Sequence, residues 1–293
     1  MHPAVLGIQL PTSAAAAAAP ALRRVFFVTI MAASFARQTA AMSTSSASSS
    51  RGQAFASSLP PLPAFTKRLI LARHGQTDWN AQGLMQGGGF DIELNAEGRQ
   101  QGQLLADELS ELITSNRNVA IASSHLKRAL QTASYLWTDE HQQPLKSDAR
   151  FGEMRFGDFE GLAIHGPKAT EETRSKFQTM QEKMSSDIHF RMPGNNAEST
   201  LEVSQRGVAG ITELLVDSSD LNESLFCVVA HGRFNKILLS SLLYNDPSRY
   251  TEFEQSNTCI NVLDYNKQTE QWKAVVLNYT DHAPTAYAKF ALS

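Results

Sequence analysis

Three short apolar segments, each followed by a segment with helical spacing, limit the possible folds more than any other sequence feature. Their length and composition suit strands that are buried on both faces of a sheet. They are residues 68–72 (RLILA), 118–123 (NVAIAS) and 225–230 (LFCVVA), and the helical segments that follow are 95–113, 127–137 and 233–244. Strands that alternate with helices predict a three-layer α/β/α sandwich with a mainly parallel central sheet.

Capping residues and a polar turn locate further elements. Asn95 is expected to cap the helix over 95–113, and Ser199 with Glu202 forms a capping-box pattern that opens a helix to about residue 216. Two runs at 259–265 and 271–279 predict strands joined in a hairpin. Residues 163–195 show the least regular pattern and are expected to form helical excursions over one end of the sheet.

The N-terminal segment differs sharply in composition from the rest of the chain. Residues 1–66 contain no Asp or Glu, four Arg, and 27 Ala plus Ser. This composition is typical of an organellar transit segment, mitochondrial or plastidic, so we expect a disordered leader over 1–66 and a catalytic domain over 67–293. Twelve mostly apolar residues, 25–36, follow two arginines and leave a secretory signal open. A cytoplasmic protein with a floppy extension is the remaining alternative.

The composition of the remaining chain excludes several classes of protein. Residues 67–293 hold 22 basic and 29 acidic residues, a formal charge of -7, which argues against nucleic-acid and anionic-membrane partners. No run of about eighteen apolar residues is present for stable membrane insertion. The two cysteines lack the spacing of a disulfide framework or a zinc site. The oligomeric state, monomer or homodimer, stays open.

Two of the apolar segments end in the same dipeptide, His followed by Gly. These are His74-Gly75 and His231-Gly232, and the carboxyl ends of parallel strands meet at one edge of a sheet. Arg73 precedes the first histidine, and Arg128 falls in the first turn of the helix predicted at 127–137. An arginine is unfavourable at a helix N-terminus unless an anion shares the position. A phosphate-sized anion site is predicted here, although each residue alone also suits a partly buried histidine or a surface arginine.

Four sequence blocks resemble the signatures of the histidine phosphatase superfamily, the phosphoglycerate mutase-like proteins. They occur in the family's order, with the expected strands and helices around them, and the resemblance covers roughly residues 66–282. The blocks are RHGQTDWN at 73–80, SSHLKRALQTA at 123–133, GEMRFGDFEGL at 152–162 and VVAHG at 228–232.

The resemblance implies a nucleophile and a site that binds phosphate. His74 is expected to attack the phosphoryl group and form a phosphohistidine, while Arg73, Arg128 and a cationic or hydrogen-bond-donating His231 offset the phosphate charge. Because these groups supply the positive charge, no metal ion or other cofactor is expected. Asn80 matches the family's phosphate-binding asparagine and could instead only cap a helix.

The resemblance also implies a proton donor. Glu153 occupies the family's position for the general acid, which protonates the leaving alkoxide and then activates water. An exposed loop glutamate is the alternative. Glu160, in the same block, is expected to stabilise a turn.

Two features favour the phosphatase branch over the mutases. Residues 163–192 lack the basic, Tyr- and Pro-rich insertion of mutases, and Gln76-Thr77 stands where mutases usually carry Glu-Ser. We therefore expect a hydrolase that acts on a small phosphorylated metabolite. A phosphoglycerate mutase and a non-catalytic module that binds phosphate esters remain the alternatives, which assays of phosphate release and of phosphoglycerate interconversion would separate.

Overall fold

The computed structural model describes residues 45–116, 119–138, 141, 144–217 and 224–283. Most of the expected leader, including residues 25–36, lies outside the described residues, and so does residue 118 of the second predicted strand. Within the described residues, no helix has the length and apolar character needed to cross a membrane.

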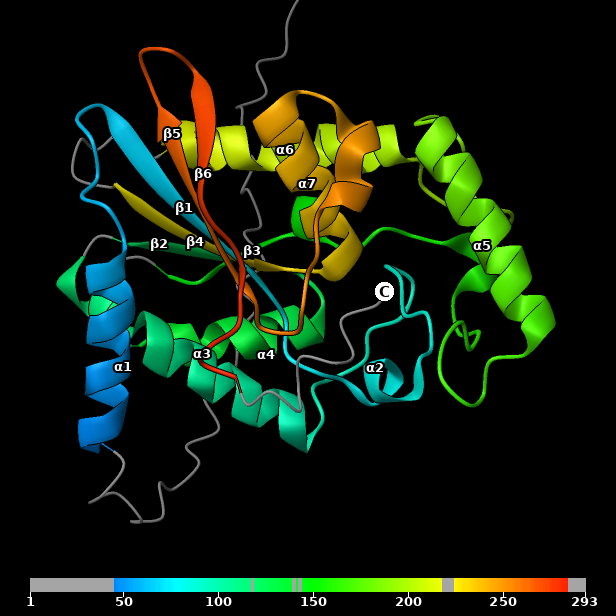
Figure 1. The fold of residues 1–293 in the computed structure, drawn as a ribbon, viewed down its shortest axis with the longest axis horizontal. Coiled ribbons are helices and arrows are strands. Elements are labelled where there is room, and N and C mark those ends of the chain that lie inside the picture. Colours follow the sequence, from blue (N-terminus) through cyan, green and yellow to red (C-terminus); the bar gives the residue numbers. More distant parts are fainter. Residues whose placement is uncertain (1–44, 117–118, 139–140, 142–143, 218–223, 284–293) are drawn as a thin grey trace, which may run out of the picture. The chain divides into compact units, whose positions relative to one another are not determined.

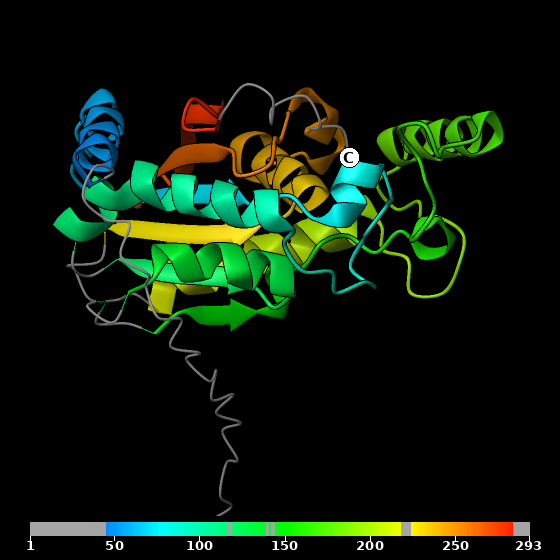
Figure 2. The ribbon, with the colours of Figure 1, turned by 90° about the horizontal axis from the view of Figure 1, so that it is seen from below.

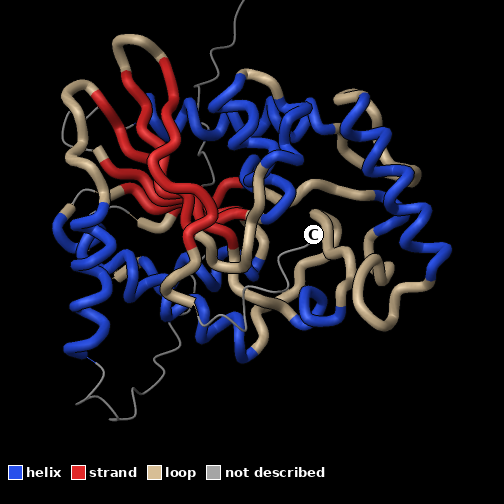
Figure 3. Tube along the Cα trace, in the orientation of Figure 1, coloured by secondary structure: helices blue, strands red, loops and turns tan. Residues whose placement is uncertain are grey.

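A six-stranded mixed sheet forms the centre of the fold, in the order β3-β2-β4-β1-β5-β6 (Figures 1 and 3). The first four strands in this order are parallel, whereas β5 runs antiparallel to β1 and β6 antiparallel to β5. The strands are β1 Thr66–Arg73, β2 Ala120–Ser124, β3 Lys146–Asp148, β4 Leu225–Ala230, β5 Ile260–Asn266 and β6 Gln271–Tyr279. The mainly parallel sheet and the C-terminal hairpin predicted from the sequence are confirmed.

Helices cover both faces of this sheet (Figures 1 and 2). On one face α3 (Ala96–Ser115) packs beside α4 (Lys127–Leu136), and on the other α6 (Thr200–Asp217) packs beside α7 (Gly232–Tyr244). Alternate residues of the buried strands enter the two cores: Leu69 and Leu71 pack with α6 and α7, whereas Ile70 and Ala72 pack with α3 and α4. This two-residue period explains why a strand covered on both faces is apolar throughout.

The predicted helix caps have the expected hydrogen bonds. The Asn95 side chain accepts the Gly98 amide at 2.8 Å, at the start of α3. Before α6, the Glu202 amide donates to Ser199 Oγ at 3.2 Å while the Ser199 amide donates to Glu202 Oε2 at 2.9 Å. These reciprocal bonds satisfy amides that the first helical turn leaves unpaired.

Residues 45–58, which the sequence analysis places in the leader, form a helix that packs on the domain. Helix α1 (Ser45–Ser58) packs along α3, and a Cβ atom on Gly52 would lie 2.4 Å from Ser110 Oγ. Phe55 and Leu59 are buried in the core shared with α3 and α4, and the Phe55 ring lies 4.8 Å from that of Tyr279. The Ser- and Ala-rich sequence has no periodic apolar face, and these two anchors supply the packing.

The irregular region contains one long helix. The expected excursion is α5 (Glu171–Ser186), which Thr170 caps and which buries Phe177 and Met184. The shorter helices are α2 Asp78–Gln82 and the 3₁₀ turns η1 Ala149–Phe151, η2 Gly157–Phe159 and η3 Pro247–Glu252.

Candidate active site

The carboxyl ends of β1 and β4 bring the two His-Gly dipeptides together. The strands are parallel neighbours in which Arg73 pairs with Ala230, and the His74 amide donates to the Ala230 carbonyl at 3.0 Å. The rings of His74 and His231 follow directly, with centroids 5.1 Å apart. The sheet therefore places both histidines at one edge, as the strand ends predicted.

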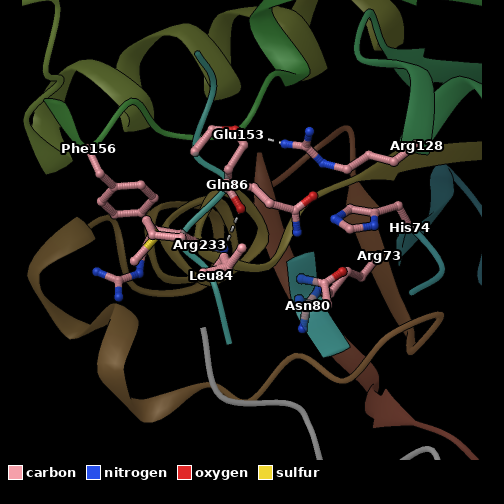
Figure 4. A pocket seen from close by; sticks show the side chains of 11 residues that line it. Arg73, His74, Asn80, Leu84, Gln86, Arg128, Glu153, Phe156 and Arg233 are labelled. Atoms are coloured by element: carbon pink, nitrogen blue, oxygen red, sulfur yellow. Dashed lines mark hydrogen bonds between the residues drawn. The ribbon is translucent and has the colours of Figure 1, made fainter. Parts of the chain in front are cut away.

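A small pocket opens to solvent beside these histidines (Figure 4). Five of the six predicted site residues line it, and the sixth, His231, lies against the ring of His74. The five are Arg73, His74, Asn80, Arg128 and Glu153. These five come from three separate sequence blocks and His231 from a fourth, so the fold assembles the cluster that the sequence predicted.

His74 is held as one tautomer. Its Nδ1 lies 2.6 Å from the Gly75 carbonyl oxygen. Since a carbonyl oxygen only accepts, Nδ1 carries the proton and Nε2 keeps its lone pair. Burial, and then the charges of Arg128 and Arg73, hold the pKa of His74 well below 6.5. The imidazole is thus neutral at neutral pH and able to act as a nucleophile.

Two buried guanidinium groups provide positive charge. Arg128 donates from Nη2 to the Gly87 carbonyl and from Nη1 to the Phe90 carbonyl, both at 2.8 Å, and Arg73 Nη1 donates to the Gln255 carbonyl at 2.6 Å. Burial lowers the pKa of Arg128 to about 10 and also lowers the pKa of Arg73. Both side chains remain cationic near pH 7, so the pocket favours an anion.

His231 carries its ring proton on Nε2, which can therefore donate a hydrogen bond. Its Nδ1 accepts the Nε–H of Arg128 at 3.3 Å, so the ring proton of the neutral imidazole resides on Nε2. Burial, and then Arg128, lower the pKa of His231 well below 6.5. Nε2 is buried without a hydrogen-bond partner among the described residues. Of the two expected forms, cationic or donating, the structure favours the neutral donor.

Glu153 lies at the N-terminus of α7. Its Oε1 accepts the amides of Met154 at 2.8 Å and Phe234 at 2.9 Å, and its Oε2 accepts the Arg233 amide at 3.2 Å. A carboxylate suits unpaired amides at the positive end of a helix. Glu153 is therefore a fixed group of the pocket wall rather than an exposed loop residue.

Asn80 caps a helix and also lies in the pocket wall. Its Oδ1 accepts the Thr77 amide at 3.1 Å, and Thr77 Oγ1 accepts the Asn80 amide, which makes a capping box for α2. The same side chain lines the pocket. With Oδ1 engaged in the cap, its Nδ2 amide is the group suited to donate to an anion.

Glu160 stabilises a turn, as predicted. Its Oε1 accepts the Phe156 amide at 2.9 Å, and burial raises the pKa of its carboxyl group.

Two polar side chains of the pocket wall, Gln86 and Arg233, were not identified from the sequence. Gln86 lies in a glycine-rich loop, where its Oε1 accepts the hydroxyl of Thr77 at 2.9 Å. Arg233 directly follows the second His-Gly dipeptide and is 4% exposed. Its position next to a candidate catalytic dipeptide could have identified Arg233 as a pocket residue. However, an arginine at the start of a predicted helix also has the pattern of an exposed surface charge.

No cluster of three or more His, Cys, Asp or Glu side chains suited to a metal ion occurs in the part of the chain that the structure describes. Both cysteines, Cys227 and Cys259, are buried free thiols.

Sequence comparison shows which known proteins this chain is similar to. A sequence model described as "Histidine phosphatase superfamily (branch 1)" matches residues 69–280. A glucosyl-3-phosphoglycerate phosphatase of Mycolicibacterium vanbaalenii is 30% identical over 182 residues, which is 60% of this chain and 74% of that protein. A 2,3-bisphosphoglycerate-dependent phosphoglycerate mutase of Arthrobacter is 28% identical over 197 residues, 60% of this chain and 77% of that protein.

Solved structures share the fold as well. A phosphoserine phosphatase from Entamoeba histolytica, in complex with 3-phosphoglyceric acid, matches with a TM-score of 0.59 and 28% identity. The match covers 74% of this chain and 99% of that one. Similarity thus extends to both phosphatases and mutases.

Proposed function

This chain belongs to the histidine phosphatase superfamily, and from that premise we propose that it is a phosphomonoester hydrolase that forms a phosphohistidine on His74. The observation that carries the proposal is the tautomer of His74. With its proton on Nδ1, bonded to the Gly75 carbonyl, its Nε2 lone pair is available for attack on phosphorus. The depressed pKa of His74 keeps that lone pair free of a proton.

In the proposed first step, Nε2 of His74 bonds to phosphorus as the ester P–O bond breaks. Arg73, Arg128 and the Nε2–H of His231 bind the phosphoryl oxygens, where charge stabilisation contributes most to phosphoryl transfer. Asn80 donates from Nδ2 to the same group. Because the two arginines supply the positive charge, the mechanism uses no metal ion.

Glu153 is the proposed proton donor. Oε2 makes the longest of the three amide contacts, at 3.2 Å, and is the oxygen that we assign to carry the proton given to the leaving alkoxide. In the second step water attacks the phosphohistidine, the P–N bond breaks, and the Glu153 carboxylate takes the proton from water. Inorganic phosphate leaves, and both side chains return to their starting forms.

The proposed substrates are small phosphorylated metabolites. The relatives named above act, according to their names, on glucosyl-3-phosphoglycerate, phosphoserine and phosphoglycerates. The similarity to a mutase supports phosphoglycerate mutase activity as the second candidate. Release of inorganic phosphate from p-nitrophenyl phosphate supports hydrolysis, whereas interconversion of phosphoglycerates that needs a bisphosphoglycerate primer supports the mutase. Binding of phosphate esters without either reaction would support a non-catalytic module.

Trapping the intermediate tests the mechanism. Rapid quenching with labelled substrate should yield one phosphate per chain, stable in alkali and lost in acid. His74→Ala is expected to trap none, and His189→Ala, which removes an exposed imidazole, is the matched control. A His74→Ala protein that retained full turnover would exclude the proposed nucleophile.

We also propose that residues 1–44, which precede α1, carry the organellar address. Their lack of Asp and Glu and their arginines support this assignment. A fluorescent protein fused behind residues 1–44 should collect in mitochondria or plastids, and a diffuse cytoplasmic signal would refute the assignment.

A further inference from the structure

Arg233 is a buried cation with unused hydrogen-bond donors. It lines the pocket from the first turn of α7, and its guanidinium lies 4.9 Å from the Tyr250 ring centroid and 5.6 Å from that of Phe156. Its Nη2 donates to Oε1 of Gln181, on α5, at 3.0 Å. Its Nε and Nη1 are buried without a hydrogen-bond partner among the described residues.

Such an arrangement is unfavourable unless an anion completes it. A buried guanidinium is always charged, and both the desolvation of its charge and its unpaired N–H groups cost free energy. The carboxylate that lines the same pocket, Glu153, accepts backbone amides, including that of Arg233 itself. Burial and then Arg233 lower the pKa of nearby Lys236 to about 8, which still leaves it mostly protonated at pH 7, so it adds a second positive charge near Arg233.

The guanidinium of Arg233 lies apart from the site proposed for phosphoryl transfer. Figure 4 shows it beside Phe156, on the opposite side of the pocket from His74, with Gln86 between the two. One phosphoryl group bonded to His74 therefore leaves the donors of Arg233 for another group of the same ligand.

We propose that Arg233 binds a second anionic oxygen group, a carboxylate or another phosphate, on the phosphomonoester that His74 attacks. This inference rests on the proposed function and deepens it, because it gives esters that carry two acidic groups a higher kcat/KM than esters that carry one. Gln181 orients the guanidinium, which links the substrate preference to α5, the excursion outside the sheet.

Matched pairs of substrates test the proposal. In the first pair 3-phosphoglycerate differs from glycerol 3-phosphate by a carboxylate, and in the second fructose 1,6-bisphosphate differs from fructose 6-phosphate by a phosphate. We expect the wild type to have a higher kcat/KM for the doubly acidic member of one pair. Arg233→Met keeps a long side chain against the aromatic rings. It should lower the ratio of kcat/KM for the doubly acidic member to kcat/KM for its partner by about 10- to 100-fold. The pair that responds identifies the acidic group.

Two further variants separate charge at the pocket from charge elsewhere. Arg233→Lys restores the positive charge and should recover part of the ratio. Arg249→Met is the control, because Arg249 also lies over a tyrosine, 3.6 Å from the Tyr244 ring centroid, but is exposed and paired with Glu252. It should keep the wild-type ratio. Ratios that are unchanged in Arg233→Met, or a wild type without preference in either pair, would overturn the proposal.

A binding measurement keeps this test independent of turnover. Calorimetric titration of His74→Ala with each pair should show tighter binding of the doubly acidic member, and His74→Ala/Arg233→Met should lose that difference. If p-nitrophenyl phosphate is hydrolysed but the binding difference is missing, Arg233 is misassigned and the proposed function stands. If no ester is hydrolysed but the difference is present, the proposed function fails and the second anion site stands.

Discussion

A buried arginine lies near each end of β1, Arg68 at the amino end and Arg128 at the carboxyl end. Among the described residues, a carboxylate neutralises the charge of the first but not of the second. At the amino end Arg68 forms two hydrogen bonds with Asp264, from Nε at 2.7 Å and from Nη2 at 2.9 Å, and both side chains are buried. At the carboxyl end Arg128 donates to two backbone carbonyls and to His231. No ion pair within the described chain neutralises it.

We propose that this difference separates a structural arginine from one that binds the ligand. A guanidinium that is paired with a carboxylate within the protein has no remaining charge to offer a ligand, and its loss should affect folding. A guanidinium held only by neutral acceptors keeps its positive charge for an incoming anion, and its loss should affect activity. Four predictions test this contrast.

Arg68→Met should give the largest effect, on stability alone. Asp264 is left buried without its counter-charge, which is expected to lower the free energy of unfolding by about 3–5 kcal/mol. Urea unfolding measures this loss. The folded variant should keep wild-type kcat/KM, and Arg68→Met/Asp264→Leu should regain much of the stability. A single variant as stable as the wild type would show that the pair is not structural.

Arg128→Met should chiefly affect activity. Removal of one donor to the phosphoryl group is expected to lower kcat/KM for p-nitrophenyl phosphate by roughly 10²- to 10³-fold. Steady-state kinetics of Arg128→Met and Arg68→Met, measured under the same conditions, compares their kcat/KM values. Equal kcat/KM values in the two variants would remove the distinction between the two ends.

Glu153→Gln tests the carboxylate at the active end. Loss of the proton donor should slow hydrolysis of alkyl phosphates by roughly 10²-fold, whereas nitrophenyl phosphate, whose leaving group needs no proton, should lose less. Asp264→Asn, at the other end, should show no dependence on the leaving group. Equal losses on both substrates in Glu153→Gln would remove Glu153 from the acid role.

The smallest effect is expected in the pH dependence of stability. The pKa values of His74 and His231 lie well below 6.5 in the folded chain, chiefly through burial and then through Arg128. As the pH falls from about 7.5 to about 5.5, the unfolded chain therefore binds more protons than the folded one, and the free energy of unfolding decreases. Urea unfolding of the wild type and of His74→Asn/His231→Gln measures the change. A decrease of the same size in both proteins would contradict this origin.

The sequence predicted those parts of the fold and pocket whose causes are local or periodic. Strand β4 was predicted at its observed bounds because an apolar run of that length needs cover on both faces. His74 and His231 were brought together by a general property of parallel strands, which requires no knowledge of side-chain contacts.

The parts that were missed depend on contacts between segments distant in sequence. Strand β3 has only three residues, two of them exposed, and forms because β2 offers a free edge. Helix α1 depends on Phe55 against α3 and β6. Arg233 is buried because Tyr250 of η3 and Gln181 of α5 lie against it. The sequence around Arg233 does not predict these contacts.

The hydrogen bond from His74 to the Gly75 carbonyl also bears on the speed of the chemical step. Its two partners are adjacent in the chain, and Gly75 is itself fixed, because its amide donates to Thr132 at 3.0 Å and a Cβ there would lie 2.4 Å from the Gly98 carbonyl oxygen. The peptide therefore has little freedom to turn its carbonyl away from the ring. Folding alone selects this tautomer, so the nucleophile that we propose needs no proton rearrangement when a ligand arrives, and we expect its reorganisation energy to be low.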